Sequence, residues 1–209
     1  IWEQLGRVTN ALSWCFSEAQ DWMENNFNEY QKENYLKPLL LGTKKECYAI
    51  TETEAGSDVE GSIKTTAEKK GDQYMINGEK WYVTSANIAD FFFLQAKIIS
   101  EDNKDKQALF IVDKNSKGIE LVDTPLFSHT YAHHHSIYRF NNVAIPIMNI
   151  IGEEGRGMDY THSWFRHERL GIAARCCGAA ERLIDEATTF AKERESFGEK
   201  ISNYQAIQF

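Results

Sequence analysis

Long apolar segments are missing from this chain of 209 residues, and no run approaches the roughly 18 apolar residues of a membrane-spanning helix. Proline is scarce, and the four cysteines have neither the spacing of metal ligands nor that of a disulfide framework. Basic residues are not in excess: the net charge is −8, whereas nucleic-acid-binding domains normally carry a basic face. These absences argue against a membrane span, a disulfide scaffold and a nucleic-acid binder. They favour a reducing compartment, either the cytoplasm or a mitochondrial matrix, over secretion.

Apolar residues are plentiful enough for a folded core. Hydrophobic residues make up 42% of the chain and aromatic residues 12%, so intrinsic disorder is excluded. The length allows one large domain or parts of two.

The first 46 residues have the periodicity of helices. One set of apolar residues recurs at helical spacing, and a second set follows an Asn/Glu-rich break at residues 24–29. We expect the second helix to end at Lys37-Pro38, because a residue before proline avoids the α region. The two sets are Leu5, Val8, Leu12, Cys15 and Phe16, and Tyr30, Tyr35, Leu36 and Leu39.

Residues 47–147 change to the pattern of short strands separated by turns, which predicts a closed or sandwiched antiparallel sheet. Segments 64–70 and 73–76 are joined through Gly71-Asp72, and Asn77-Gly78 predicts a tight hairpin turn into 79–84. Further strands are expected at 91–98, 108–112, 118–122 and 136–140, with a polar loop at 100–107. No G-x-G-x-x-G joins a strand to a helix, so a Rossmann fold is not predicted.

A small-residue turn at residues 55–58 follows the apolar run 47–50, which stops at Thr51-Glu52. The sequence Ala55-Gly56-Ser57-Asp58 has little bulk, so a ligand could approach its backbone closely. The alternative is ordinary turn and cap chemistry, because Ser, Thr and Asp side chains commonly bond the nearby backbone.

The C-terminal part is predicted to be one long helix. A glycine-punctuated loop at 148–157 precedes residues 159–193, which would span roughly 50 Å as a helix. Apolar residues on this helix form a stripe, which favours a bundle or interface element. The stripe consists of Phe165, Ile172, Cys176, Ala179, Leu183, Ala187 and Phe190.

Three motifs in this order resemble those of the acyl-CoA dehydrogenase family. The first is T-E-x-x-x-G-S-D at residues 51–58, and the second is G-x-K-x-x-x-T at residues 78–84. The third is Glu168-Arg169 on the long helix, followed by R-E-S-F-G at 194–198 and Gln205. The resemblance covers essentially the whole chain but only the middle of a family member, so we expect a fragment. It implies an α+β fold: the end of a helical domain (1–46), a middle β-domain (47–150) and the start of a C-terminal helical bundle (151–209).

The resemblance implies FAD as the cofactor. Thr51 and Thr84 match hydroxyls that bond the flavin, Tyr82 matches an aromatic residue packed against it, and the backbone of Tyr48 and Ile50 would lie near the isoalloxazine ring. An ordinary cross-strand aromatic pair is the alternative role for Tyr82.

Ser57 matches a residue that binds the thioester arm of the acyl-CoA. Strand alternation places Trp81 on the face opposite Tyr82, although many family members carry the tryptophan at the position of Tyr82.

Glu168 is the candidate catalytic base. It lies one helical turn from Ile172, beside the apolar stripe, where a carboxylate is costly unless it is paired or functional. Some family members place their catalytic glutamate at this position and others place it in the C-terminal helices. Glu168 would otherwise be a structural acid paired with an arginine, and Arg169 matches a residue that lines the CoA site.

Arg194, Ser196 and Gln205 match residues that hold the FAD diphosphate and adenosine of a neighbouring subunit, which implies a homodimer or homotetramer. An arginine suits this role because its planar group pairs with phosphate oxygens at two points. The alternative is a solvated, charged helix end.

The run His133-His134-His135 does not predict a metal site. Consecutive residues of a strand point to opposite faces, so the three side chains cannot all reach one ion. A substrate-side or pairing role is favoured for them instead.

The reaction implied by the resemblance is α,β-desaturation of an acyl-CoA. A carboxylate would remove the α-proton while the β-hydrogen leaves as hydride to the flavin, and the electrons would pass to an electron-transfer flavoprotein. A flavin-dependent oxidase or monooxygenase and a non-catalytic interaction module are the alternatives.

Overall fold

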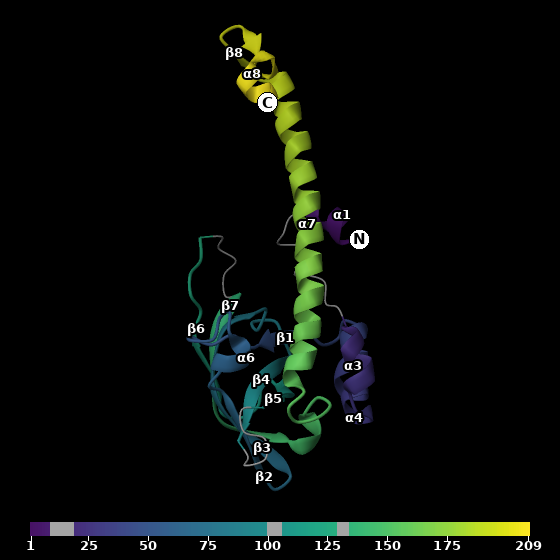
Figure 1. The fold of residues 1–209 in the computed structure, drawn as a ribbon, viewed down its shortest axis with the longest axis vertical. Coiled ribbons are helices and arrows are strands. Elements are labelled where there is room, and N and C mark those ends of the chain that lie inside the picture. Colours follow the sequence, from purple (N-terminus) through teal and green to yellow (C-terminus); the bar gives the residue numbers. More distant parts are fainter. Residues whose placement is uncertain (9–18, 100–105, 129–133) are drawn as a thin grey trace. The chain divides into compact units, whose positions relative to one another are not determined.

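The structure is a computed structural model that describes residues 1–8, 19–99, 106–128 and 134–209 (Figure 1). These residues fall into two units, one of residues 19–164 and one of residues 1–8 and 165–209. Leu12, Cys15, Phe16 and most of the predicted loop at 100–107 lie outside the described residues. The division at residues 46 and 150 stays a prediction.

Short helices open the larger unit: α3 (Asp21–Asn26), α4 (Glu29–Gln31), the π-helical turn η1 (Lys32–Leu36) and α5 (Lys37–Leu40). The prediction that the helix ends at Lys37-Pro38 is wrong, because the backbone stays helical to Leu40. A π turn has i→i+5 hydrogen bonds, here from the Lys37 N–H to the Lys32 carbonyl. Pro38 then occupies the first turn of α5, where its missing N–H costs little.

A curled sheet of seven strands fills most of the larger unit (Figure 1). Its strands lie in the order β1-β4-β2-β3-β7-β6, and β5 pairs with the other edge of β4. They are β1 (Glu46–Ala49), β2 (Thr66–Lys70), β3 (Gln73–Thr84), β4 (Phe91–Ile99), β5 (Gln107–Asp113), β6 (Ile119–Asp123) and β7 (His135–Pro146).

The sheet is mixed, which corrects the expectation of a purely antiparallel one. Strands β1 and β2 both run parallel to β4, with β1 on Phe91–Leu94 and β2 on Lys97–Ile99. The two strands therefore follow each other along one edge of β4 in the same direction. The segment 50–65, which carries the first motif and the helix α6 (Val59–Ser62), leaves this line after β1 and returns to it at β2.

Strand β4 is buried on both faces, which explains its unbroken apolar sequence. Phe92 and Leu94 belong to the core inside the curl of the sheet. Phe91 and Phe93 face a second core, which is completed by residues of the helices that precede the sheet. Those residues are Trp22, Met23, Phe27, Tyr35, Leu36 and Leu39.

The hairpin turn lies at Gly71-Asp72 alone, and the prediction of a second turn at Asn77-Gly78 is wrong. Strand β3 runs through both residues, and its pairing with β7 shifts register between Ile76 and Gly78, as in a β-bulge. Gly78 has φ +156°, and a Cβ there would collide with the side chain of Thr65. Glycine is thus needed for close approach of two backbones, a role that the Asn-Gly turn signal imitates.

The helix predicted at residues 159–193 is α7 (Gly157–Glu193), which begins in the larger unit and continues into the smaller one. Within the smaller unit, α1 (Trp2–Gly6) packs against α7 at two glycines. A Cβ on Gly6 would collide with the backbone of Arg175, and one on Gly178 with the backbone of Glu3. Much of the apolar stripe of α7 is exposed, including Ile172, Leu183 and Phe190.

The C-terminal residues of the smaller unit form the hairpin of β8 (Glu195–Ser196) and β9 (Glu199–Lys200), the turn η3 (Ile201–Asn203) and α8 (Gln205–Gln208). None of the helices that the structure describes is long and apolar enough to cross a membrane.

Candidate functional site

The first two motifs lie side by side in the larger unit. The backbone N–H of Trp81 in β3 donates to the carbonyl of Thr51 at 2.8 Å. The ammonium of Lys80 donates to the carbonyl of Ile50, also at 2.8 Å. These two bonds join the end of the segment 48–51 to the part of β3 that leads to Tyr82 and Thr84.

A buried ion pair holds the junction. Lys80 is fully buried and Glu52 is 8% exposed, and their charged atoms are 2.8 Å apart. The carboxylate of Glu52 also accepts two hydrogen bonds from the backbone. The N–H of Thr65 donates to Oε1 at 3.0 Å, and the N–H of Lys64 donates to Oε2 at 2.5 Å. Glu52 therefore connects β3 to both ends of the segment 50–65.

The protonation of this pair follows from its burial. Burial lowers the pKa of Lys80 to about 8, although the nearby carboxylate of Glu52 opposes this change. Burial alone would raise the pKa of Glu52, but the charge of Lys80 and the hydrogen bonds to the carboxylate outweigh it and lower that pKa. Both groups are charged at neutral pH, each because the other is present.

The turn that carries Ser57 is fixed at both ends. Glu52 and Ala55 exchange backbone hydrogen bonds of 3.2 and 3.1 Å. Asp58 caps α6 by accepting from the N–H of Gly61 at 2.9 Å and from the hydroxyl of Ser62 at 2.6 Å. Gly56 has open space around it, and Ser57 is exposed. Ser57 is thus presented to solvent on a short, well-anchored loop.

The end of β3 is bent, which corrects the predicted placement of Trp81. Tyr82 has φ +54°, and the pairing with β7 shifts register between Lys80 and Val83. Strict alternation fails at such a bulge. The rings of Trp81 and Tyr82 consequently lie edge to face, 5.6 Å apart, and not on opposite faces of a regular strand. Tyr82 is 47% exposed and so offers part of its ring to a ligand.

Thr84 lies opposite His135 in the pairing of β3 with β7. Its hydroxyl is 2.9 Å from Nδ1 of His135 and 3.4 Å from the carbonyl of Tyr82. The histidine run favours a substrate-side or pairing role from the sequence, but nothing in the sequence indicates that His135 contacts Thr84. The available signal was a histidine at the start of a strand, but only the register of the sheet places it next to Thr84.

Tyr48 and Ile50 enter the junction through their backbone. The ring of Tyr48 stacks on Trp164 with centroids 3.8 Å apart, and it packs 5.0 Å from Phe93. The side chain of Tyr48 is therefore committed to packing. The role of the backbone of Tyr48 and Ile50 toward a flavin stays a prediction.

Glu168 and Arg169 lie on α7 in the smaller unit. The arginine near Glu168 is Arg175, two turns along the helix and 4.0 Å away, and not Arg169. The guanidinium of Arg169 lies 5.8 Å from the ring centroid of Phe165. Glu168 is half-buried, and its role as the base stays a prediction.

Arg194, Ser196 and Gln205 come together in the C-terminal hairpin and helix of the smaller unit. The carbonyl of Arg194 accepts from the N–H of Ile201 at 2.9 Å, and the carbonyl of Ser196 accepts from the hydroxyl of Tyr204 at 2.9 Å. Gln205 begins α8 directly after this tyrosine. The three predicted residues thus belong to one local structure.

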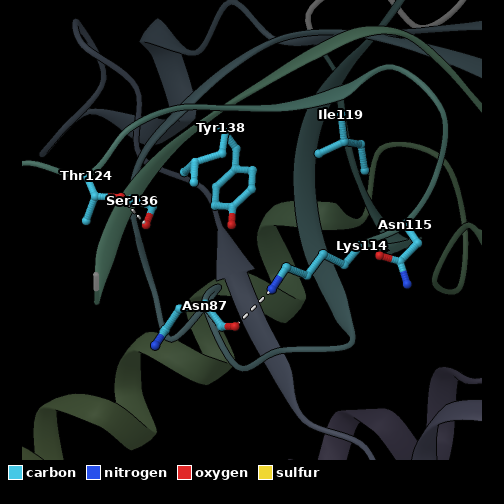
Figure 2. Close-up of a pocket in the computed structure, with 8 residues that line it drawn as sticks. Asn87, Lys114, Asn115, Ile119, Thr124, Ser136 and Tyr138 are labelled. Carbon is cyan, nitrogen blue, oxygen red and sulfur yellow. Dashed lines mark hydrogen bonds between the residues drawn. The ribbon is translucent and has the colours of Figure 1, made fainter. Parts of the chain in front are cut away.

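A separate hollow of about 420 Å³ lies beside β6 and β7 in the larger unit (Figure 2). None of the predicted site residues lines it. Two hydrogen bonds join groups that line it: Lys114 donates to the carbonyl of Asn87 at 3.1 Å, and the hydroxyls of Thr124 and Ser136 are 3.1 Å apart (Figure 2).

No group of three or more His, Cys, Asp or Glu side chains in the described segments could hold a metal ion. His133 lies outside those segments. His134 is 3.4 Å from the hydroxyl of Ser85, and His135 contacts Thr84.

Comparison with known proteins identifies the family. Residues 47–143 match the model of the acyl-CoA dehydrogenase middle domain, and residues 155–209 match that of the acyl-CoA dehydrogenase C-terminal domain. The chain belongs to the acyl-CoA dehydrogenase family of oxidoreductases, whose members are FAD flavoproteins.

The relatives of this chain are longer than the chain itself. It is 32% identical to 3-(aryl)acrylate reductase of Clostridium sporogenes, over 100% of this chain and 56% of that protein. It is 36% identical to the CarC subunit of the caffeyl-CoA reductase–Etf complex of Acetobacterium woodii, over 87% and 48%. The structure of butyryl-CoA dehydrogenase from Megasphaera elsdenii superposes with a TM-score of 0.88 at 27% identity, over 99% of this chain and 55% of that one. The chain thus spans about half the length of the relatives it matches.

The aromatic ring and the hydroxyl groups at the junction fit a flavin. An isoalloxazine ring needs an aromatic or apolar surface and hydrogen-bonding groups at its edge. The partly exposed ring of Tyr82 and the hydroxyls of Thr51 and Thr84 supply groups of this kind within one bonded junction.

We predict that Glu52→Gln destabilises the larger unit by about 3–5 kcal/mol, because it leaves the buried charge of Lys80 without its partner. Urea titration of the complete polypeptide encoded by the gene measures the change. Glu54→Gln is the matched control, since Glu54 pairs with Lys64 on the surface of the same loop and its loss should change little. Equal effects of the two substitutions would contradict the role of the buried pair.

A second prediction concerns pH. The pKa of Lys80 is about 8 in the folded protein and 10.5 when free, so between these values the unfolded chain holds a proton that the folded chain has released. The contribution of Lys80 to the free energy of unfolding therefore rises with pH across this window. Lys80→Met should remove this rise in urea titrations at pH 8 and pH 10. An unchanged pH dependence in the variant would show that Lys80 titrates normally.

Proposed function

We propose that this chain carries the flavin- and substrate-binding parts of an enzyme that transfers hydrogen at the α,β-bond of an acyl-CoA thioester. The observation that supports this most is the junction in which the Lys80–Glu52 pair joins Thr51, at the start of the loop that carries Ser57, to the part of β3 that leads to Tyr82 and Thr84. Such a junction can present hydroxyls and an aromatic ring to a planar cofactor at one edge, and a thioester arm at the other.

FAD supplies the acceptor for the two electrons and the β-hydrogen. Its ring is bound and oriented by the side chains of Thr51, Tyr82 and Thr84 and by the backbone of Tyr48 and Ile50. Arg194, Ser196 and Gln205 bind the diphosphate and adenosine of the FAD in a neighbouring subunit, so the enzyme is a homodimer or homotetramer.

In the proposed reaction, Ser57 and Arg169 position the acyl-CoA and Glu168 removes the α-proton. The C–H electron pair at the α-carbon forms the new double bond as the β-hydrogen departs with its own pair. The α-proton ends on Glu168, and the electrons leave the enzyme to an electron-transfer flavoprotein. A site that excludes water and polarises the thioester carbonyl makes the α-proton acidic enough to remove.

Reduction of an α,β-unsaturated acyl-CoA is the second candidate. It involves the same bond and the same groups in reverse, and two relatives are named as reductases, 3-(aryl)acrylate reductase and a subunit of a caffeyl-CoA reductase–Etf complex. The reduction potential of the substrate couple relative to that of the electron carrier decides which direction dominates.

The test uses the complete polypeptide purified with its flavin under anaerobic conditions. We predict that acyl-CoA bleaches the flavin, and that Glu168→Gln slows bleaching by about 10²–10⁴-fold while FAD stays bound, because the base is lost. Glu186→Gln is the control: Glu186 lies on the same helix in an exposed pair with Arg182, and its replacement should leave the rate unchanged.

Near-normal bleaching by the Glu168→Gln variant would assign the base to another residue. A purified protein without flavin would contradict the proposed function as a whole and favour an interaction module. Rapid reoxidation by oxygen in the absence of an electron-transfer flavoprotein would indicate an oxidase.

A further inference from the structure

The hydroxyl of Thr84 has two protein neighbours and only one proton. The carbonyl of Tyr82, at 3.4 Å, can only accept a hydrogen bond. Nδ1 of His135, at 2.9 Å, can donate or accept, depending on which ring nitrogen carries the proton. The arrangement of protons at His135 therefore decides what the Thr84 hydroxyl can offer to a ligand.

Only one arrangement satisfies both contacts. If Nδ1 lacks a proton, Thr84 must donate to His135, and the contact with the carbonyl of Tyr82 is left without a proton. If Nδ1 carries the proton, His135 donates to Oγ1 of Thr84 and the Thr84 proton points to the carbonyl of Tyr82. The hydrogen bond from Thr84 to that carbonyl is long. A better acceptor on a ligand can therefore replace the carbonyl as the partner of the Thr84 hydroxyl.

The imidazole of His135 is held in place by its surroundings. Its backbone is paired with that of Thr84 across β3 and β7. Its ring lies edge to face with Phe127 at 5.2 Å and with His134 at 4.7 Å. The contact with Thr84 is therefore built into the sheet.

We propose that His135 is a positioning residue for flavin binding. It donates through Nδ1 to Oγ1 of Thr84, and this leaves the Thr84 proton for an acceptor nitrogen of the oxidised flavin ring. The inference rests on the proposed function, because it requires FAD at the junction of Thr51 and Thr84.

Three substitutions distinguish the effect of hydrogen-bond donation by His135 from the effect of its side-chain shape. His135→Asn keeps an N–H group close to the position of Nδ1. His135→Asp has nearly the same shape but only accepts, so it draws the Thr84 proton away from the flavin. His135→Leu makes no hydrogen bond, and the comparison of Asn with Asp carries the test if the Leu variant folds poorly.

The measurements are the dissociation constant of oxidised FAD and the position of the flavin absorption bands, neither of which depends on turnover. We expect the Asn variant to resemble the wild type. The Asp and Leu variants should bind FAD about 5- to 10-fold more weakly, the effect of one neutral hydrogen bond, and their flavin bands should shift.

Two controls distinguish positioning from a general structural role. In a Thr84→Val background, the Asn and Asp substitutions should have equal effects, because the hydroxyl on which His135 acts is gone. His162→Gln changes another, half-exposed histidine, which faces Glu60 and not His135, and should leave FAD affinity and the flavin bands unchanged.

Equal FAD affinities and spectra of the Asn and Asp variants in the presence of Thr84 would overturn the inference. A persistent difference between them in the Thr84→Val background would also overturn it. Failure of the proposed function looks different: the wild-type protein would bind no FAD, or Thr84→Val alone would leave both measurements unchanged.

Discussion

The ion pair between Lys80 and Glu52 is the interaction on which the candidate site depends. It is buried, and a buried charge is tolerated only when its partner and its hydrogen bonds are in place. The carboxylate of Glu52 also accepts from the backbone of Lys64 and Thr65, while the ammonium of Lys80 donates to the carbonyl of Ile50. One pair thus fixes where the segment 50–65 leaves the sheet, where it returns, and how it faces β3. A hydrophobic pair of similar volume could fill this space, but it would not orient three backbone groups.

The sheet provides the frame in which this pair acts. Strands β1 and β2 follow one another along the edge of β4, so the segment between them is a loop that leaves and rejoins a single line of hydrogen bonds. Irregular pairing of β3 with β7 also helps to position the residues of the site. The bulge near Gly78 brings its backbone close to Thr65, and the second bulge turns Tyr82 outward and leaves Thr84 opposite His135. Backbone irregularities of this kind are concentrated where a site needs side chains aimed away from the regular pleat.

Much of the fold could be predicted from the sequence, because strong periodicity and apolar runs reflect burial. The extents of β4, β5 and α7 are confirmed for this reason. The antiparallel sheet, the turn at Asn77-Gly78 and the helix end at Pro38 failed because each rested on a local rule that tertiary contacts overrode. The motifs located the loop of Ser57 and the end of β3, but their roles toward FAD and acyl-CoA stay predictions. The partnership of Lys80 with Glu52 and the contact of His135 with Thr84 depend on register, which a single sequence does not reveal.

Hydrogen exchange of the backbone amides tests the central role of the ion pair most directly. The N–H groups of Lys64 and Thr65 bond the carboxylate of Glu52, and that of Trp81 bonds the carbonyl of Thr51. In the Lys80→Met variant of the complete polypeptide, these three amides should lose protection while the amides of β4 and β5 keep theirs, because opening would be confined to the junction. Unchanged protection at Lys64, Thr65 and Trp81, or an equal loss throughout the sheet, would contradict the account.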